Sequence, residues 1–140
     1  MQVITSAIDS RDGVFIGENN DTPTTPFNFK QMTVQTIFGT SASEFLIAPD
    51  DLGHTIRGKG GHDHIKGANG NDILRGGSGD DWIEGFGGND KIIGGQGNDV
   101  VFGDSGNDFI KGKSGDDLVY GGSGFDILKG NRGDDILYGG

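Results

Sequence analysis

Aspartate recurs at a fixed spacing along the C-terminal part of this 140-residue chain. Between residues 58 and 138 the sequence divides into nine units of nine residues, without an insertion or a deletion, and the sixth residue of every unit is aspartate. These residues are Asp63, Asp72, Asp81, Asp90, Asp99, Asp108, Asp117, Asp126 and Asp135. Rows of carboxylates repel one another unless cations lie between them, and calcium is a hard cation that prefers oxygen ligands. The spacing therefore indicates binding of a divalent cation such as calcium.

Three further fixed positions indicate the elements that hold these aspartates. The first and fourth residues of each unit are always glycine, and the eighth is always Ile, Leu or Val. Two glycines per unit disfavour a helix by about 1 kcal/mol each and favour turns that a Cβ would forbid. Each unit is therefore predicted to form a turn and then a very short strand, with the eighth side chain facing the core. If two units form one coil, side chains stack eighteen residues apart.

The composition excludes several other classes of function. The formal net charge of -10 disfavours binding to nucleic acids or to anionic lipids. The chain contains no cysteine, so disulfide bonds and thiolate chemistry are excluded, and no apolar run is long enough to span a membrane. With 29 glycines and 31% hydrophobic residues, the chain needs another source of stability, which bound metal would provide.

The repeat resembles the RTX, or haemolysin-type calcium-binding, nonapeptide family, whose consensus is G-G-x-G-x-D-x-U-x, over residues 58–138. The resemblance implies an all-β fold, a right-handed parallel β-roll, in which Ca²⁺ lies between coils and is bound by aspartates and backbone carbonyls. Asp63 and Asp81 would share one ion and Asp72 and Asp90 another, so the nine aspartates would bind about seven ions. Six units depart from the consensus at the second position, where glycine is replaced by Lys59, Ala68, Phe86, Asp104, Lys113 and Asn131.

A role for calcium in folding follows from the weak core and from the resemblance. One aliphatic side chain per unit buries too little apolar area to offset the entropy of ordering the repeats, so we predict that the chain folds when calcium binds. Proteins of the RTX family pass unfolded through type I secretion systems and fold in extracellular calcium. We therefore expect a secreted, bacterial-type calcium-binding module, alone or within a larger toxin, protease, lipase, epimerase or surface protein.

The N-terminal part of the chain does not follow the repeat. Residues 1–48 are predicted to be a cap or a fragment of an upstream segment, with an entering strand within residues 39–48. Residues 49–140 are predicted to form the roll, with a degenerate first repeat at residues 49–57 and regular repeats at residues 58–138. In the degenerate repeat Gly53 and Ile56 keep the phase, but His54 replaces the expected aspartate.

Eighteen-residue coils would also gather apolar side chains on one outer surface, here called the aromatic face. Its residues are Trp82, Val100, Leu118 and Ile136 from the seventh position and Phe102, Tyr120 and Tyr138 from the ninth. An exposed apolar patch often marks an interface, so an alternative function is binding of a partner or self-assembly, with calcium serving only the structure. Ordinary β-propensity at half-exposed positions would produce the same residues.

Two other patterns could suggest chemistry. His54, His62 and His64 could bind zinc, but units nine residues apart lie on opposite edges of the roll, so His54 is not expected to meet the other two. Adjacent carboxylates such as Asp80 and Asp81 could act in acid–base catalysis, but one of each pair already belongs to the aspartate column. We therefore predict no catalytic residues and no enzymatic activity.

Overall fold

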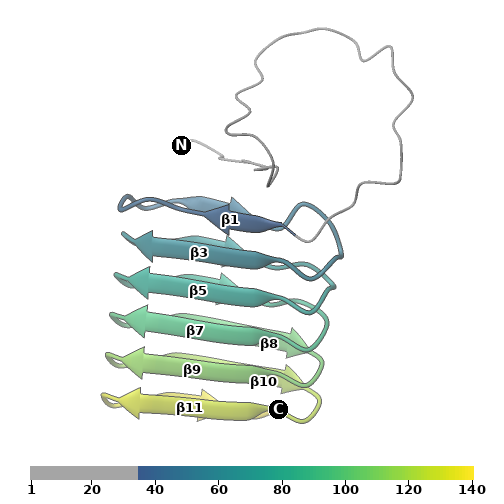
Figure 1. Ribbon diagram of the computed structural model, residues 1–140. Coiled ribbons are helices and arrows are strands. Elements are labelled where there is room, and N and C mark those ends of the chain that lie inside the picture. Colours follow the sequence, from purple (N-terminus) through teal and green to yellow (C-terminus); the bar gives the residue numbers. More distant parts are fainter. Residues whose placement is uncertain (1–34) are drawn as a thin grey trace, which may run out of the picture.

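The computed structural model describes residues 35–140, whose regular elements are all strands (Figure 1). Twelve strands form two parallel sheets of six, and consecutive strands along the chain alternate between the sheets, so that two strands and two turns make one coil. About six coils stack into a β-solenoid, which confirms the predicted parallel β-roll. The described residues include no helix long and apolar enough to cross a membrane.

The strands of each sheet follow one another in sequence order. The first sheet contains β1 (Thr36–Phe38), β3 (Thr55–Gly60), β5 (Ile73–Ser78), β7 (Lys91–Gln96), β9 (Phe109–Ser114) and β11 (Ile127–Arg132). The second sheet contains β2 (Phe45–Ile47), β4 (His64–Lys66), β6 (Trp82–Glu84), β8 (Val100–Ser105), β10 (Leu118–Ser123) and β12 (Ile136–Tyr138). From β3 and β4 onward each residue pairs with the residue eighteen positions later, as Leu74 does with Ile92. This step confirms the predicted coil of two units.

The core lies between the sheets and consists of one row of aliphatic side chains from each sheet. Side chains alternate along a strand, so the eighth residue of each unit points inward while its two neighbours point outward. Seven of these inward residues have an exposed fraction of 0%: Ile65, Leu74, Ile83, Ile92, Val101, Ile110 and Val119. Toward the last coil the core becomes accessible, since Leu128 is half-buried and Leu137 is 42% exposed.

Both sheets extend N-terminal of residue 49, where the roll was predicted to begin. The entering strand expected within residues 39–48 is β2, which pairs with β4, and β1 pairs with β3. The step of this pairing is nineteen residues, as in Ile37 with Ile56, so the turn between β2 and β3 contains one additional residue. The assignment of residues 1–48 to a cap or an upstream fragment remains a prediction, and residues 1–34 lie outside the described part of the chain.

Because each unit contributes only one aliphatic side chain to the core, a single truncation should weaken the roll measurably. Ile92 is fully buried, and we expect Ile92→Ala to lower the free energy of unfolding by about 2 to 5 kcal/mol. Ile127, which is 55% exposed on the outside of β11, provides the control, and Ile127→Ala should cost at most about 1 kcal/mol. Guanidinium denaturation at saturating calcium measures both values, and equal losses would contradict this assignment of the core.

Candidate calcium sites

The nine aspartates lie in the turns at the two edges of the roll. Turns that lead from the first sheet to the second form the first edge and carry Asp63, Asp81, Asp99, Asp117 and Asp135. Turns that lead back to the first sheet form the second edge and carry Asp72, Asp90, Asp108 and Asp126. The seven aspartates from Asp63 to Asp117 are each between 1% and 3% exposed. The repeat therefore buries two rows of carboxylates, one along each edge.

One oxygen of each carboxylate holds adjacent coils together. The Asp63 N–H donates to Asp81 Oδ1 at 2.8 Å, and Asp81 N–H donates to Asp99 Oδ1 at 2.9 Å. The same bond recurs along both edges, ending at Asp126 and Asp135. Each Oδ1 thus accepts a backbone hydrogen bond from the preceding coil, which fixes the orientation of the carboxylate.

The other oxygen, Oδ2, is buried without a hydrogen-bond partner in seven of the nine aspartates. These are Asp63, Asp81, Asp90, Asp99, Asp108, Asp117 and Asp126. A buried carboxylate oxygen without a hydrogen-bond partner is costly, and its recurrence at the equivalent atom of seven turns indicates that these atoms suit one kind of ligand. An anion needs a cation or a donor there, and the surrounding groups include no free donor at these atoms.

Glycine at the first position leaves room for that partner. A Cβ added to Gly85 would collide with Asp90 Oδ2 and would lie 2.8 Å from the carbonyl oxygen of Gly103 in the next coil. A Cβ at Gly121 would meet Asp126 Oδ2 and, at 2.6 Å, Gly139 O. In each case one carboxylate oxygen and one carbonyl oxygen converge on a small space that only glycine leaves open, and calcium prefers such ligands. No three His, Asp or Glu side chains of residues 35–140 converge on one point, so side chains alone do not form a site, and backbone oxygens or water would supply the remaining ligands.

The model of the RTX calcium-binding nonapeptide repeat matches the chain in four copies, at residues 55–83, 75–110, 84–119 and 111–140. The chain belongs to this family. The resemblance predicted from the repeat is confirmed, and the repeats of this chain are calcium-binding repeats arranged in a β-roll. No curated protein sequence matches the chain.

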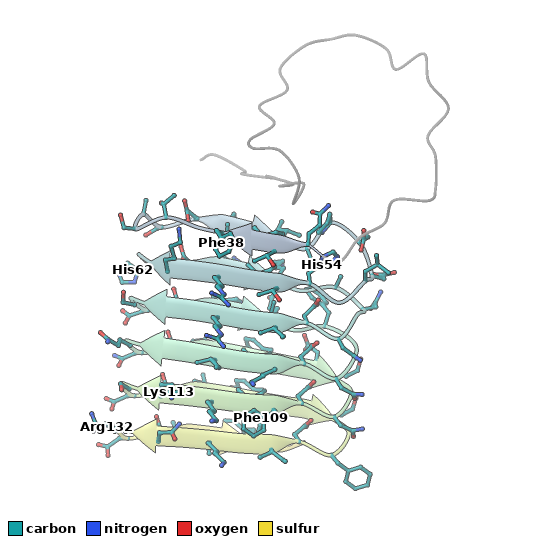
Figure 2. The ribbon with its side chains drawn as sticks, viewed as in Figure 1. Phe38, His54, His62, Phe109, Lys113 and Arg132 are labelled. Atoms are coloured by element: carbon teal, nitrogen blue, oxygen red, sulfur yellow. The ribbon has the colours of Figure 1, made fainter. Side chains whose placement is uncertain are left out.

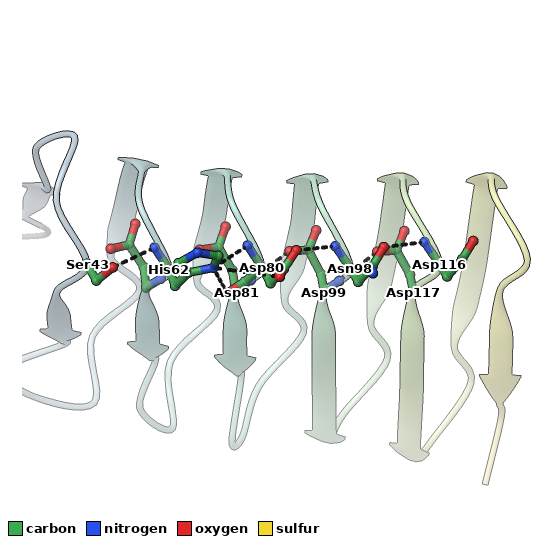
Figure 3. A network of polar contacts seen from close by, with 9 residues as sticks. Ser43, His62, Asp80, Asp81, Asn98, Asp99, Asp116 and Asp117 are labelled. Atoms are coloured by element: carbon green, nitrogen blue, oxygen red, sulfur yellow. Dashed lines mark hydrogen bonds and ion pairs between the residues drawn. The ribbon is translucent and has the colours of Figure 1, made fainter.

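A second ladder in the RTX turns uses the fifth residue of each unit (Figure 3). Asp80 Oδ1 accepts the Asn98 N–H at 2.8 Å, and Asn98 Oδ1 accepts the Asp116 N–H at 2.9 Å. This ladder runs opposite to that of the aspartates, since here the side chain accepts from the following coil. Asn71, Asn89 and Asn107 do the same on the second edge. The adjacent carboxylates, such as Asp80 and Asp81, therefore serve two different structural ladders.

The sequence carried a signal for this second ladder that was not used. Seven of the nine fifth residues are Asn or Asp, and the exceptions are His62 and Phe125. His62 Nδ1 replaces the carbonyl-type acceptor and receives the Asp80 N–H at 2.9 Å. The direction of the bonds depends on how coils stack, which the pattern of a single unit does not reveal.

His54 lies apart from His62, as the sequence predicted. Figure 2 shows His54 and His62 at opposite edges of the roll. His54 is buried at the aspartate position of its turn, where its Nδ1 accepts the Gln35 N–H at 3.0 Å and its Nε2 lies 2.8 Å from Asp50 Oδ1. His64 lies on the outer side of β4 and faces Glu84, with 3.5 Å between His64 Nε2 and Glu84 Oε2.

The pKa of several buried aspartates is raised in the metal-free roll. Burial raises the pKa of Asp63 to about 6 and the pKa of Asp90 and of Asp99 to about 7. The carboxylates of adjacent coils add to this rise, and the hydrogen bonds to Oδ1 oppose it. Because the folded-state pKa is raised, ionisation destabilises the metal-free roll as the pH increases from about 4 to about 7.

Protons should compete with calcium in the pH range of these raised pKa values. If the ionised carboxylates are the calcium ligands, the calcium concentration at half-maximal binding should increase several-fold when the pH falls from about 7.5 to about 5.5. Calcium titrations followed by Trp82 fluorescence at three pH values measure the change. A midpoint independent of pH would show that carboxylates with raised pKa values are not the ligands.

Proposed function

We propose that this chain is a calcium-binding module that folds when calcium binds between its coils. The observation that supports the proposal is the buried, unpartnered Oδ2 atom that recurs in seven aspartates. Without metal these rows place like charges in a region shielded from water, which opposes folding. A cation beside each Oδ2 would neutralise the row, so the free energy of binding becomes free energy of folding.

The ligands proposed are the aspartates of the sixth position together with backbone carbonyl oxygens of the same and the next coil. Pairing the nine aspartates between neighbouring coils gives about seven ions, a number that rests on the repeat pattern. The cradle beside Gly58 illustrates the arrangement, because Asp63 Oδ2 and Gly76 O both border the space that a Cβ would fill there. Interior carboxylates would contact ions above and below, which makes binding cooperative along an edge.

Secretion is proposed from the expected affinity. Extracellular calcium modules bind at about 0.1 to 1 mM, a concentration that the cytosol does not reach, so the chain would stay unfolded inside the cell and fold outside. This matches export as an unfolded chain in a bacterial type I system, alone or as part of a larger protein. We propose no enzymatic activity, since the paired carboxylates of the described turns are engaged in the two ladders.

Calcium-dependent folding is tested by circular dichroism. We expect a β-sheet spectrum in millimolar calcium, a largely disordered spectrum in excess EDTA, and recovery when calcium is restored. Magnesium added in place of calcium should not restore the spectrum, because magnesium requires a smaller octahedral site and keeps its waters. A β-sheet spectrum that persists unchanged in EDTA would overturn the proposal.

A matched pair of variants extends the same test to the ligands. Asp99→Asn keeps an Oδ1 acceptor for the Asp81 N–H but removes the unpartnered oxygen, so it should raise the calcium midpoint by about tenfold. Asp116→Asn removes the same charge at the fifth position, where Asn98 already serves as the acceptor one coil earlier. Asp116→Asn should therefore leave the midpoint within about twofold, and equal effects of the two variants would contradict the ligand assignment.

A second candidate function is partner binding by the aromatic face. The face lies on the outside of the second sheet, where rings stack from coil to coil: the centroids of Phe102 and Tyr120 are 4.9 Å apart, as are those of Tyr120 and Tyr138. Trp82 continues the stack at 5.2 Å from Phe102 and is 41% exposed. A flat exposed surface of this kind favours association, with calcium holding the surface in shape.

Light scattering separates this second candidate from the first. If the aromatic face mediates self-association, the calcium-loaded chain should be larger than a monomer, and Phe102→Ser with Tyr120→Ser should return it to a monomer. Ile127→Ser, on the outer side of the other sheet, serves as the control. A monomeric wild-type chain at high concentration would exclude self-association through this face, and an unchanged oligomer in the double variant would place the interface elsewhere.

A further inference from the structure

The turn of residues 67–72 differs from the other turns of the repeat at its second residue. Eight of the nine units have positive φ at this position, including Lys59 at 80° and Phe86 at 73°, whereas Ala68 does not. The other five non-glycine residues at the position are exposed, while Ala68 is half-buried and packs against the core. The alanine has therefore turned inward, and the backbone of its turn has a different conformation.

This conformation supplies a donor that the other turns lack. The Ala68 N–H donates to Asp72 Oδ2 at 2.9 Å, and the His54 N–H donates to Asp72 Oδ1 at 2.6 Å. Of the seven aspartates that are at most 3% exposed, six have a buried Oδ2 without a partner, and Asp72 is the exception. Both oxygens of this carboxylate are thus satisfied by backbone amides.

The preceding coil has the same property at both edges. Glu44 occupies the sixth position on the first edge, where its carboxylate accepts the Thr40 N–H at 2.7 Å and the Thr40 hydroxyl at 2.8 Å. On the second edge His54 bonds to Asp50 at 2.8 Å in place of an aspartate. On the second edge, the chain's own hydrogen bonds therefore occupy the sixth-position side chains of two successive turns, those of His54 and Asp72. On the first edge they do so in one turn, that of Glu44.

We propose that Ala68 closes the calcium site of the turn at residues 67–72, so that calcium binding on the second edge starts at Asp90. The inference rests on the proposed calcium binding and assigns Asp72 a structural role in place of ligation. To bind calcium there, Asp72 would have to lose the Ala68 N–H, and Ala68 would have to leave the core for a left-handed conformation that a Cβ disfavours. In the folded roll these N-terminal turns are then joined by hydrogen bonds in the place of metal.

The experiment counts calcium ions per chain by native mass spectrometry at saturating calcium. Ala68→Gly restores the G-G-x-G-x-D turn and should bind one ion more than the wild-type chain. Lys59→Gly is the control, because Lys59 is the second residue of another unit and already has positive φ. The number of calcium ions bound by this variant should equal that of the wild-type chain. In the Ala68→Gly background, Asp72→Asn should remove the gained ion. In the wild-type background, Asp90→Asn should lower the count.

Two outcomes would overturn the inference. If Ala68→Gly and the wild-type chain bind the same number of ions, or if Lys59→Gly gains an ion as well, Ala68 does not close a site. Loss of an ion from the wild-type chain on Asp72→Asn would equally show that Asp72 is a ligand. A wild-type chain that binds no calcium at all would overturn the proposed function itself, so the two failures are distinguishable.

Discussion

The rows of buried carboxylates are the constraint on which the rest of the roll depends. A coil spacing of about 4.8 Å places each aspartate close to its equivalents above and below, and burial strengthens their repulsion. The two oxygens of each carboxylate have different surroundings, and both affect this repulsion. Oδ1 accepts a backbone N–H of the preceding coil, and in seven of the nine aspartates Oδ2 is buried without a hydrogen-bond partner, where we propose that calcium binds. The glycines of the first position follow from the same constraint, because they leave the space beside Oδ2 open.

Much of this architecture could be predicted from the sequence. The nine-residue period gave the strands, the coil of two units and the core row that contains Ile92, because each depends on local alternation and on a repeat that is never interrupted. The family resemblance added calcium as the ligand, which the period of the aspartates only suggested. Neither source required knowledge of contacts between residues that are distant in the sequence.

The features that were missed depend on the stacking of particular coils. Glu44 stands in the aspartate position outside the regular repeats, and it became recognisable only when the pairing of β2 with β4 fixed its register at nineteen residues. Ala68 looked like one of six equivalent replacements for glycine, yet five of the six keep positive φ and Ala68 does not. The sequence shows which residue stands at the second position of each unit. It does not show where the N–H of that residue points, because this depends on the backbone conformation and on the neighbouring coil.

The two opposed ladders also determine how the roll would respond to force along its axis. Along the regular repeats each edge turn is tied to the next coil by one bond from its fifth residue and one from its sixth, and these bonds lie between coils rather than within them. Under tension along the axis every interface between coils would bear the same force, so the coils would separate one at a time. Bound ions would reinforce those interfaces. In the second sheet the pairings of β2 with β4, β4 with β6 and β6 with β8 join three residues each, whereas β8 and β10 pair five.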